Sequence, residues 1–129
     1  MSVSIHSITF DCERWEPLVE FWSQASDFVE DPDNPNSAGD PEGALVDPER
    51  HLQLLFIPVP EPKTVKNRVH LDVVPVDNTR DEEVVRLLGL GATLVADHRR
   101  PDGTGWVVLA DPGGNEFCVE RSVGERAAT

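Results

Sequence analysis

The segments Ile5-His6-Ser7-Ile8-Thr9-Phe10 and Val69-His70-Leu71-Asp72-Val73-Val74 lie 64 residues apart in a chain of 129. Each segment alternates apolar and polar residues and carries a histidine at its second position. An acidic residue follows each histidine seven positions later, Glu13 in the first half and Asp77 in the second. A repeat of half the chain indicates two similar structural units. Two similar units also imply a pseudo-symmetric boundary, which is a natural place for a ligand pocket.

Each half reads as a strand, a helix and further strands. Residues 3–12 alternate in the manner of a strand, and the apolar residues that follow recur at the spacing of one helical face. In the second half Thr79 and Glu82 form a capping box, which predicts a helix start. The segment 27–49 is acidic and rich in turn residues, so it reads mostly as loop with short strands near 28–29 and 44–46. Further strands are predicted at 51–59, 69–76, 92–97, 106–110 and 116–122.

The composition excludes some classes of partner. The chain has 11 basic and 24 acidic residues, a formal charge of −13, which would repel nucleic acid and anionic membranes. No apolar run reaches the roughly 18 residues that a membrane-spanning helix needs. The first residues do not read as a secretory signal, and two cysteines are too few for a disulfide framework. We therefore expect a cytoplasmic protein with reduced thiols.

Several motifs together resemble the vicinal oxygen chelate superfamily, specifically glyoxalase-like domains of the glyoxalase/bleomycin resistance/dioxygenase type. They are His6 with Glu13, Phe21-Trp22, the run from Asn67 to Asp72, and the closing turn and strand from Asp111 to Val119. The resemblance covers residues 3–121. It implies an α+β fold in which two tandem βαβββ modules form a cupped, curled mixed sheet with helices outside. We expect one domain over 1–129, with module one at 3–59, a hinge at 60–66 and module two at 67–122.

In metal-dependent members of this superfamily, four side chains from the first and fourth strands of the modules hold a divalent ion. The matching positions here are His6, Leu54, His70 and Cys118. Leu54 cannot bind a metal, so we expect none. If a metal does bind, the resemblance leaves His6, His70 and Cys118 as ligands, and zinc is the most compatible ion because a thiolate is soft.

Strand alternation gives a candidate pocket lining that is largely apolar, as small-molecule sites are. The predicted ligand-binding residues are His6, Phe10, Leu54, Phe56, Asp72, Trp106 and Cys118. His70 is a candidate catalytic residue. Glu120 is a second, because it falls on the same side of the closing strand as Cys118.

Three functional hypotheses remain open at this point. The first is an enzyme with lyase or dioxygenase chemistry, and the second is a metal-free protein that sequesters a drug or metabolite. Leu54 favours the second, and so does the acidic charge, because an acidic protein suits a cationic ligand. The third is an interaction module whose cup is filled by its own side chains. The expected partner is a small organic ligand, without nucleic acid or membrane, and the resemblance implies a homodimer.

Overall fold

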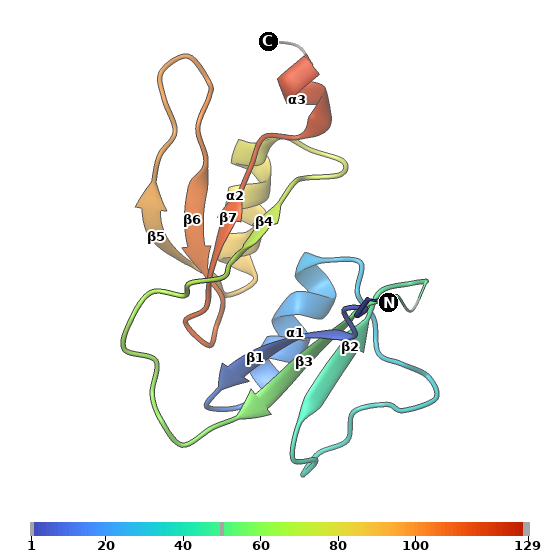
Figure 1. Cartoon of the computed structure of the whole chain (residues 1–129). Helices are drawn as coiled ribbons and strands as arrows, with labels where there is room; N and C mark the ends of the chain where they lie inside the picture. Colours follow the sequence, from blue (N-terminus) through green and yellow to red (C-terminus); the bar gives the residue numbers. More distant parts are fainter. Residues whose placement is uncertain (1, 50, 128–129) are drawn as a thin grey trace. The chain divides into compact units, whose positions relative to one another are not determined.

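The computed structural model describes residues 2–49 and 51–127 (Figure 1). The chain divides into two compact units, residues 1–64 and 65–129. Each unit combines a mixed sheet with helix, which confirms the α+β fold class that the sequence predicts. None of the helices in the described ranges has the length and apolarity needed to cross a bilayer.

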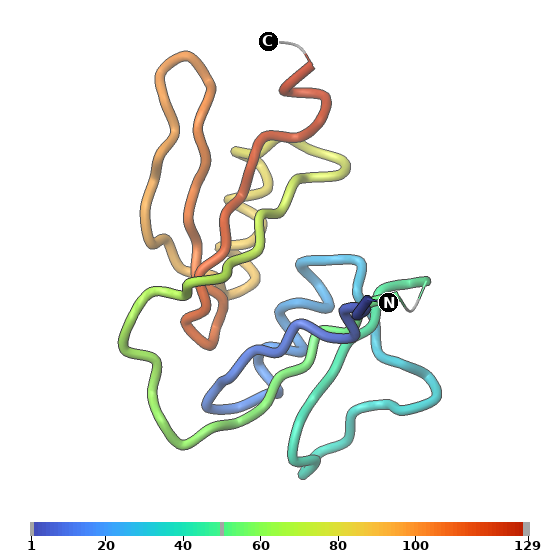
Figure 2. Tube along the Cα trace, viewed as in Figure 1, coloured from blue at the N-terminus to red at the C-terminus, as the bar shows by residue number. Residues whose placement is uncertain are grey.

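Unit one has a sheet of three strands and one helix (Figure 1), and its trace runs from blue to green in Figure 2. Its elements are β1 (Ser7–Cys12), α1 (Glu16–Ala25), β2 (Gly43–Val46) and β3 (Gln53–Pro58). The strand order is β1-β3-β2, so β3 is central. It pairs in parallel with β1 and antiparallel with β2.

Unit two has the complete strand-helix-strand-strand-strand order that the sequence predicts. Its elements are β4 (Leu71–Val73), α2 (Arg80–Gly89), β5 (Thr93–Asp97), β6 (Val107–Ala110), β7 (Glu116–Val119) and α3 (Val123–Ala127). The sheet order is β4-β7-β6-β5. Strand β7 pairs in parallel with β4 and antiparallel with β6, so it occupies the same position in its sheet as β3 does in unit one.

The 64-residue repeat is present in the backbone. Helix α2 begins and ends 64 residues after α1. Ile8 pairs with Leu54 in unit one, and Asp72 pairs with Cys118 in unit two, again at an offset of 64. The sequence repeat therefore matches the pairing of β1 with β3 and of β4 with β7. The pairing of β2 with β3 is shifted by one residue relative to that of β6 with β7, since Gly43 lies opposite Phe56 and Val107 lies opposite Val119.

The repeat is weakest at the counterpart of β5. In unit two, Thr93 of β5 pairs with Ala110, whereas in unit one the equivalent pair is an isolated bridge between Val29 and Val46. Three prolines at positions 32, 35 and 41 follow the bridge residue. Proline lacks the N–H that a strand ladder needs, which accounts for the single bridge.

The core of unit one forms where α1 packs against the sheet. Leu18, Phe21 and Trp22 are the buried residues of the helix. The Phe10 ring lies 5.9 Å from Trp22 and 5.2 Å from Phe56, measured between centroids. These aromatic contacts identify the side of β1 and β3 that faces the helix.

A capped helix and a buried arginine stabilise unit two. Thr79 and Glu82 form the capping box that the sequence predicts. The Arg80 side chain is buried and donates to the carbonyl oxygens of Gly103, Thr104 and Gly105 at 2.9–3.2 Å. A buried guanidinium is costly unless it is paired in this way, so Arg80 fixes the β5–β6 hairpin to the start of α2.

We predict that Gly43→Ala destabilises the protein by about 1–3 kcal/mol, because an added methyl overpacks a filled core. Its Cβ would lie 2.8 Å from Trp15 Cδ2 and 2.9 Å from Val19 Cγ2. Gly89→Ala is the matched control, since its Cβ would meet nothing within 4 Å. Urea unfolding of both variants measures the difference. Equal stability of Gly43→Ala and wild type would contradict the packing described for α1.

Candidate functional site

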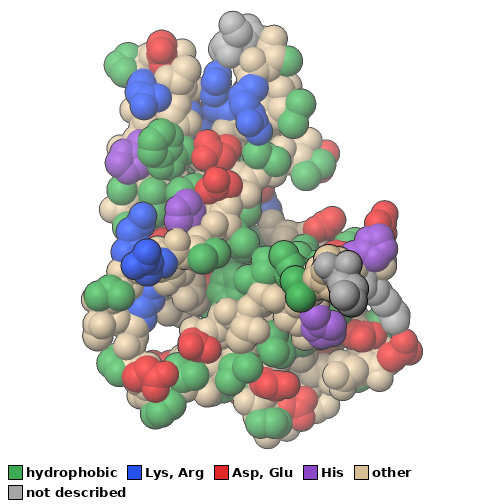
Figure 3. Space-filling model, viewed as in Figure 1, with side chains coloured by type: hydrophobic (Ala, Val, Ile, Leu, Met, Phe, Trp, Pro, Cys, Tyr) green, Lys and Arg blue, Asp and Glu red, His purple; other side chains and the backbone are tan. Residues whose placement is uncertain are grey.

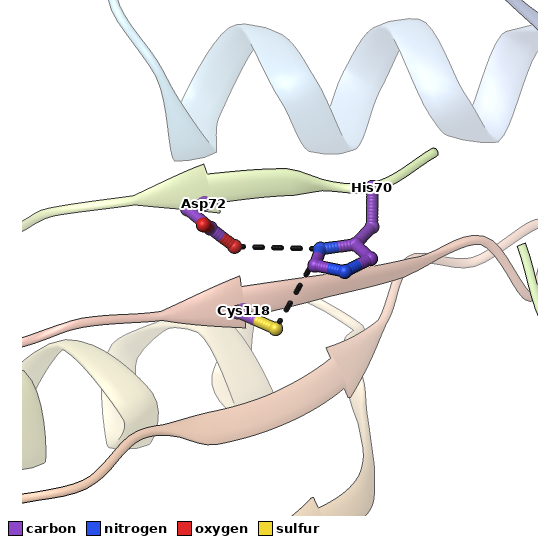
Figure 4. A group of neighbouring side chains, drawn as sticks. All are labelled: His70, Asp72 and Cys118. Atoms are coloured by element: carbon purple, nitrogen blue, oxygen red, sulfur yellow. Dashed lines mark hydrogen bonds and ion pairs between the residues drawn. The ribbon is translucent and has the colours of Figure 1, made fainter. Parts of the chain in front are cut away.

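The pairing of β4 with β7 brings three side chains of different chemistry together (Figure 4). Asp72 lies opposite Cys118 in the register, and His70 directly precedes β4. His70 Nδ1 lies 3.3 Å from Asp72 Oδ1 and 3.8 Å from Cys118 Sγ. One nitrogen, oxygen or sulfur atom from each residue lies within 4.8 Å of the other two. We call these three residues the β4–β7 centre.

The β4–β7 centre has a buried floor and an open side. Cys118 is 7% exposed, whereas the side chains of His70 and Asp72 are 34% and 58% exposed. Strand alternation places Phe117 and Val119, both fully buried, on the opposite side of β7, against which α2 packs. The centre is therefore supported from below by the core and accessible from solvent.

The environment of Cys118 favours the protonated thiol. Burial first, and then the nearby negative charges of Asp72 and Glu120, raise the pKa of Cys118 to about 11, while Lys66 opposes the rise. A thiol with this pKa is a poor nucleophile at neutral pH. A bound cation would reverse the balance, because a metal deprotonates the thiol that coordinates it.

The arrangement differs from that of a nucleophilic triad. In a triad the histidine uses one ring nitrogen for the nucleophile and the other for the acid. Here Asp72 and Cys118 both approach Nδ1 of His70. Tetrahedral zinc with ordinary bond lengths separates nitrogen from oxygen ligands by about 3.3 Å and nitrogen from sulfur by about 3.6 Å. The observed 3.3 and 3.8 Å fit those separations.

Two other residues that the sequence placed in the site lie on the same sheet. Glu120 immediately follows β7, and its N–H donates to the Val73 carbonyl at 2.9 Å. Trp106 immediately precedes β6, in which Val108 pairs with Cys118. Trp106 is therefore diagonally adjacent to Cys118 across the pairing of β6 with β7. An aromatic side chain is long enough to reach such a neighbour.

The Trp106 ring has two neighbours that sequence reasoning missed. The His98 ring lies 4.8 Å away between centroids, and the Arg100 guanidinium carbon lies 5.8 Å from the ring centroid. Both residues follow β5 and approach Trp106 through the turn of the hairpin. Their spacing in the sequence carried no signal of this contact.

The remaining predicted site residues belong to unit one. Leu54 and Phe56 are buried, and Phe10 packs between Phe56 and Trp22 of α1. These three residues thus take part in the packing of β1 and β3 against the helix. His6 is exposed, with Nδ1 2.6 Å from Ser7 Oγ.

The structure adds Asp72 to the candidate ligands. The sequence assigned Asp72 to the pocket lining and named His6, His70 and Cys118 as the ligand set. Within unit two, Asp72 is the residue that completes a set with His70 and Cys118. A signal was available, since Asp72 follows His70 by two positions and strand alternation places both on one side.

The model of the family described as "Glyoxalase-like domain" matches residues 7–120 of the chain. The chain belongs to this glyoxalase-like family. Among curated proteins none matches the chain in sequence.

Several solved structures share the fold of this chain. Fosfomycin resistance protein FosX from Mesorhizobium loti is 17% identical with a TM-score of 0.67, and the match covers both chains completely. A mutant FosX from Listeria monocytogenes, complexed with Mn(II) and 1S,2S-dihydroxypropylphosphonic acid, is 16% identical with a TM-score of 0.69 over both whole chains. A glyoxalase/bleomycin resistance protein/dioxygenase superfamily member from Sphaerobacter thermophilus is 20% identical with a TM-score of 0.61, covering 92% of this chain and 97% of the other. At these identities the likeness shows the fold alone.

We predict that iodoacetamide alkylates Cys118 very slowly below pH 10 in protein treated with chelator. With the pKa of Cys118 raised to about 11, roughly one thiol in a thousand is ionised at pH 8. Asp72→Asn removes one negative charge beside the thiol, so it should lower this pKa and speed alkylation at pH 8. Asp77→Asn is the control. Mass spectrometry of the Cys118 peptide across pH 7–11 measures the rates, and equal rates in the two variants would contradict the proximity of Asp72.

Proposed function

We propose that this glyoxalase-like protein binds a small organic molecule with two neighbouring oxygens at the β4–β7 centre, together with a divalent ion of the zinc type. The observation that supports this proposal is the approach of a carboxylate and a thiol to one imidazole nitrogen. Imidazole, carboxylate and thiolate are all ligands that zinc accepts. The Mn(II) in the Listeria FosX structure indicates that the fold can hold a divalent ion.

His70, Asp72 and Cys118 would hold the ion through Nδ1, a carboxylate oxygen and the thiolate. Three protein ligands are the usual number at catalytic zinc sites, which keep a position open for water or substrate. The partial exposure of His70 and Asp72 supplies the route by which a ligand reaches that position. An ion held there would act as a Lewis acid on two ligand oxygens and stabilise developing negative charge, the chemistry of lyases and dioxygenases of this type.

The neighbouring residues have separate roles in this proposal. Glu120 follows Cys118 by two positions, and its negative charge acts on the thiol. It is placed to accept a proton from the bound molecule as a general base. Trp106 forms an apolar wall beside the centre, and its contacts with His98 and Arg100 restrict its movement.

A metal-free binding protein is the second candidate function. Leu54 lies 64 positions before Cys118 in the sequence repeat, and it is buried and apolar. Leu54 therefore cannot supply a metal ligand. In this alternative, His70 and Asp72 would hydrogen-bond the ligand directly, and Cys118 would remain a buried thiol.

We predict that chelator-treated protein binds one Zn²⁺ and that Cys118→Ser, His70→Ala and Asp72→Asn each weaken zinc binding by more than about 100-fold. Removing a side chain that binds zinc directly should weaken the affinity by more than the roughly 10–100-fold seen when a residue that hydrogen-bonds a ligand is changed. Calorimetric titration measures the affinity. With Co²⁺ in place of zinc, a near-ultraviolet thiolate charge-transfer band should appear in wild type and be absent in Cys118→Ser.

Three matched variants control this experiment. Cys12→Ser, His51→Ala and Asp77→Asn change the same residue types outside the centre and should bind zinc as wild type does. If wild type binds no zinc while a small ligand still binds in chelator, the metal-free alternative replaces the proposal. Equal losses in Cys12→Ser and Cys118→Ser would also contradict it.

A further inference from the structure

Two basic residues beside the β4–β7 centre have no acidic partner. Lys66 and Arg68 are exposed and make no hydrogen bond or ion pair within the described chain. The sequence holds 24 acidic residues, and in the same unit Arg80, Arg86 and Arg99 each pair with one. Unpaired bases in an acid-rich protein are available to a ligand.

The net charge also differs between the two units. Unit one has 3 basic and 13 acidic residues, a formal charge of −10, whereas unit two has 8 and 11, a charge of −3. Most of the basic residues therefore belong to the unit that carries the centre. In Figure 3, Lys and Arg side chains gather next to a histidine on the left of the view, over the segment that leads into β4.

The segment that carries the two bases is attached to the strand that carries Cys118. The Asn67 N–H, between the two bases, donates to Glu116 Oε2 at 3.1 Å. Glu116 begins β7, two residues before Cys118. The charge of Lys66 also acts on the Cys118 thiol, where it opposes the rise in pKa. Lys66 and Arg68 are thus held beside the centre rather than on a distant part of the chain.

The size of the expected ligand follows from the overall charge. A polyanion would be repelled by a protein of charge −13, whereas a small anion interacts mainly with the charges nearest to it, because salt screens the rest within roughly 10 Å. Arginine can donate two parallel hydrogen bonds to the oxygens of one carboxylate or phosphate, and lysine adds a compact positive charge.

We propose that Lys66 and Arg68 bind an anionic group of the ligand, a phosphate, phosphonate or carboxylate, while its two neighbouring oxygens lie at the β4–β7 centre. This inference rests on the proposed function and names the class of its ligand: small organic anions that carry a vicinal oxygen pair. Lys66 and Arg68 are then specificity residues that take no part in bond making.

The test compares three probes that share a pair of vicinal oxygens: glycerol 3-phosphate, glycerate and glycerol. They are titrated into zinc-loaded and chelator-treated protein and followed by amide chemical shifts and calorimetry. We expect wild type to bind glycerol 3-phosphate or glycerate at least about tenfold more tightly than glycerol, a difference of about 1.4 kcal/mol. The double variant Lys66→Gln/Arg68→Gln should lose this preference and keep its zinc affinity and thermal stability. Which anion binds better identifies the anionic group.

The control is Lys63→Gln/Arg126→Gln, which changes the net charge equally at other positions and should keep the preference. If wild type binds the three probes equally, or if both double variants lose the preference to the same extent, the inference is overturned. Failure of the proposed function looks different: zinc does not bind, yet glycerol 3-phosphate still shifts the amides of Lys66 and Arg68. That result would leave the anion site standing by itself.

Discussion

The parallel pairing of β4 with β7 is the constraint on which the candidate site depends. This register places Asp72 opposite Cys118 and leaves His70 at the entrance to β4. A slip of one residue would turn every side chain of β4 to the other side of the sheet. The register is specified by the apolar side, where Phe117 and Val119 are fully buried. The packing that stabilises unit two therefore also fixes the polar centre.

The same pairing occurs in unit one with different chemistry. There Ile8 lies opposite Leu54 at the same sequence offset, but this apolar pair belongs to the side of the sheet that faces α1, whereas Asp72 and Cys118 lie on the side away from α2. Strand pairing uses backbone groups, which do not depend on the side chains that the strands carry. The two units thus share the parallel pairing, while the candidate metal centre found among the described residues belongs to unit two.

Local signals in the sequence predicted much of the fold. The capping box at Thr79 gave the start of α2, because its hydrogen bonds join residues three positions apart. The repeat gave the order of elements in both units. It could not show that the counterpart of β5 is a single bridge at Val29, since the pattern of that segment allows a short strand as well as a loop.

The candidate site was less predictable, because alternation sorts a strand into two sides without saying which side faces a helix. Phe10 belonged to the predicted pocket lining, yet its contact with Trp22 shows that its side of β1 faces α1. The contact of Trp106 with His98 depends on the geometry of a hairpin turn, which spacing does not encode. Asp72 lies beside His70 and Cys118, whereas the ligand pattern of the family pointed to His6 as a ligand.

Zinc K-edge X-ray absorption of the zinc-loaded protein tests the central claim most directly. It reports the type and distance of the atoms bound to the ion. If the β4–β7 centre holds the metal, the first shell should contain one sulfur at about 2.3 Å and nitrogen and oxygen at about 2.0–2.2 Å. The sulfur should disappear in Cys118→Ser and persist in Cys12→Ser. A shell of nitrogen and oxygen alone in the wild-type protein would contradict the claim.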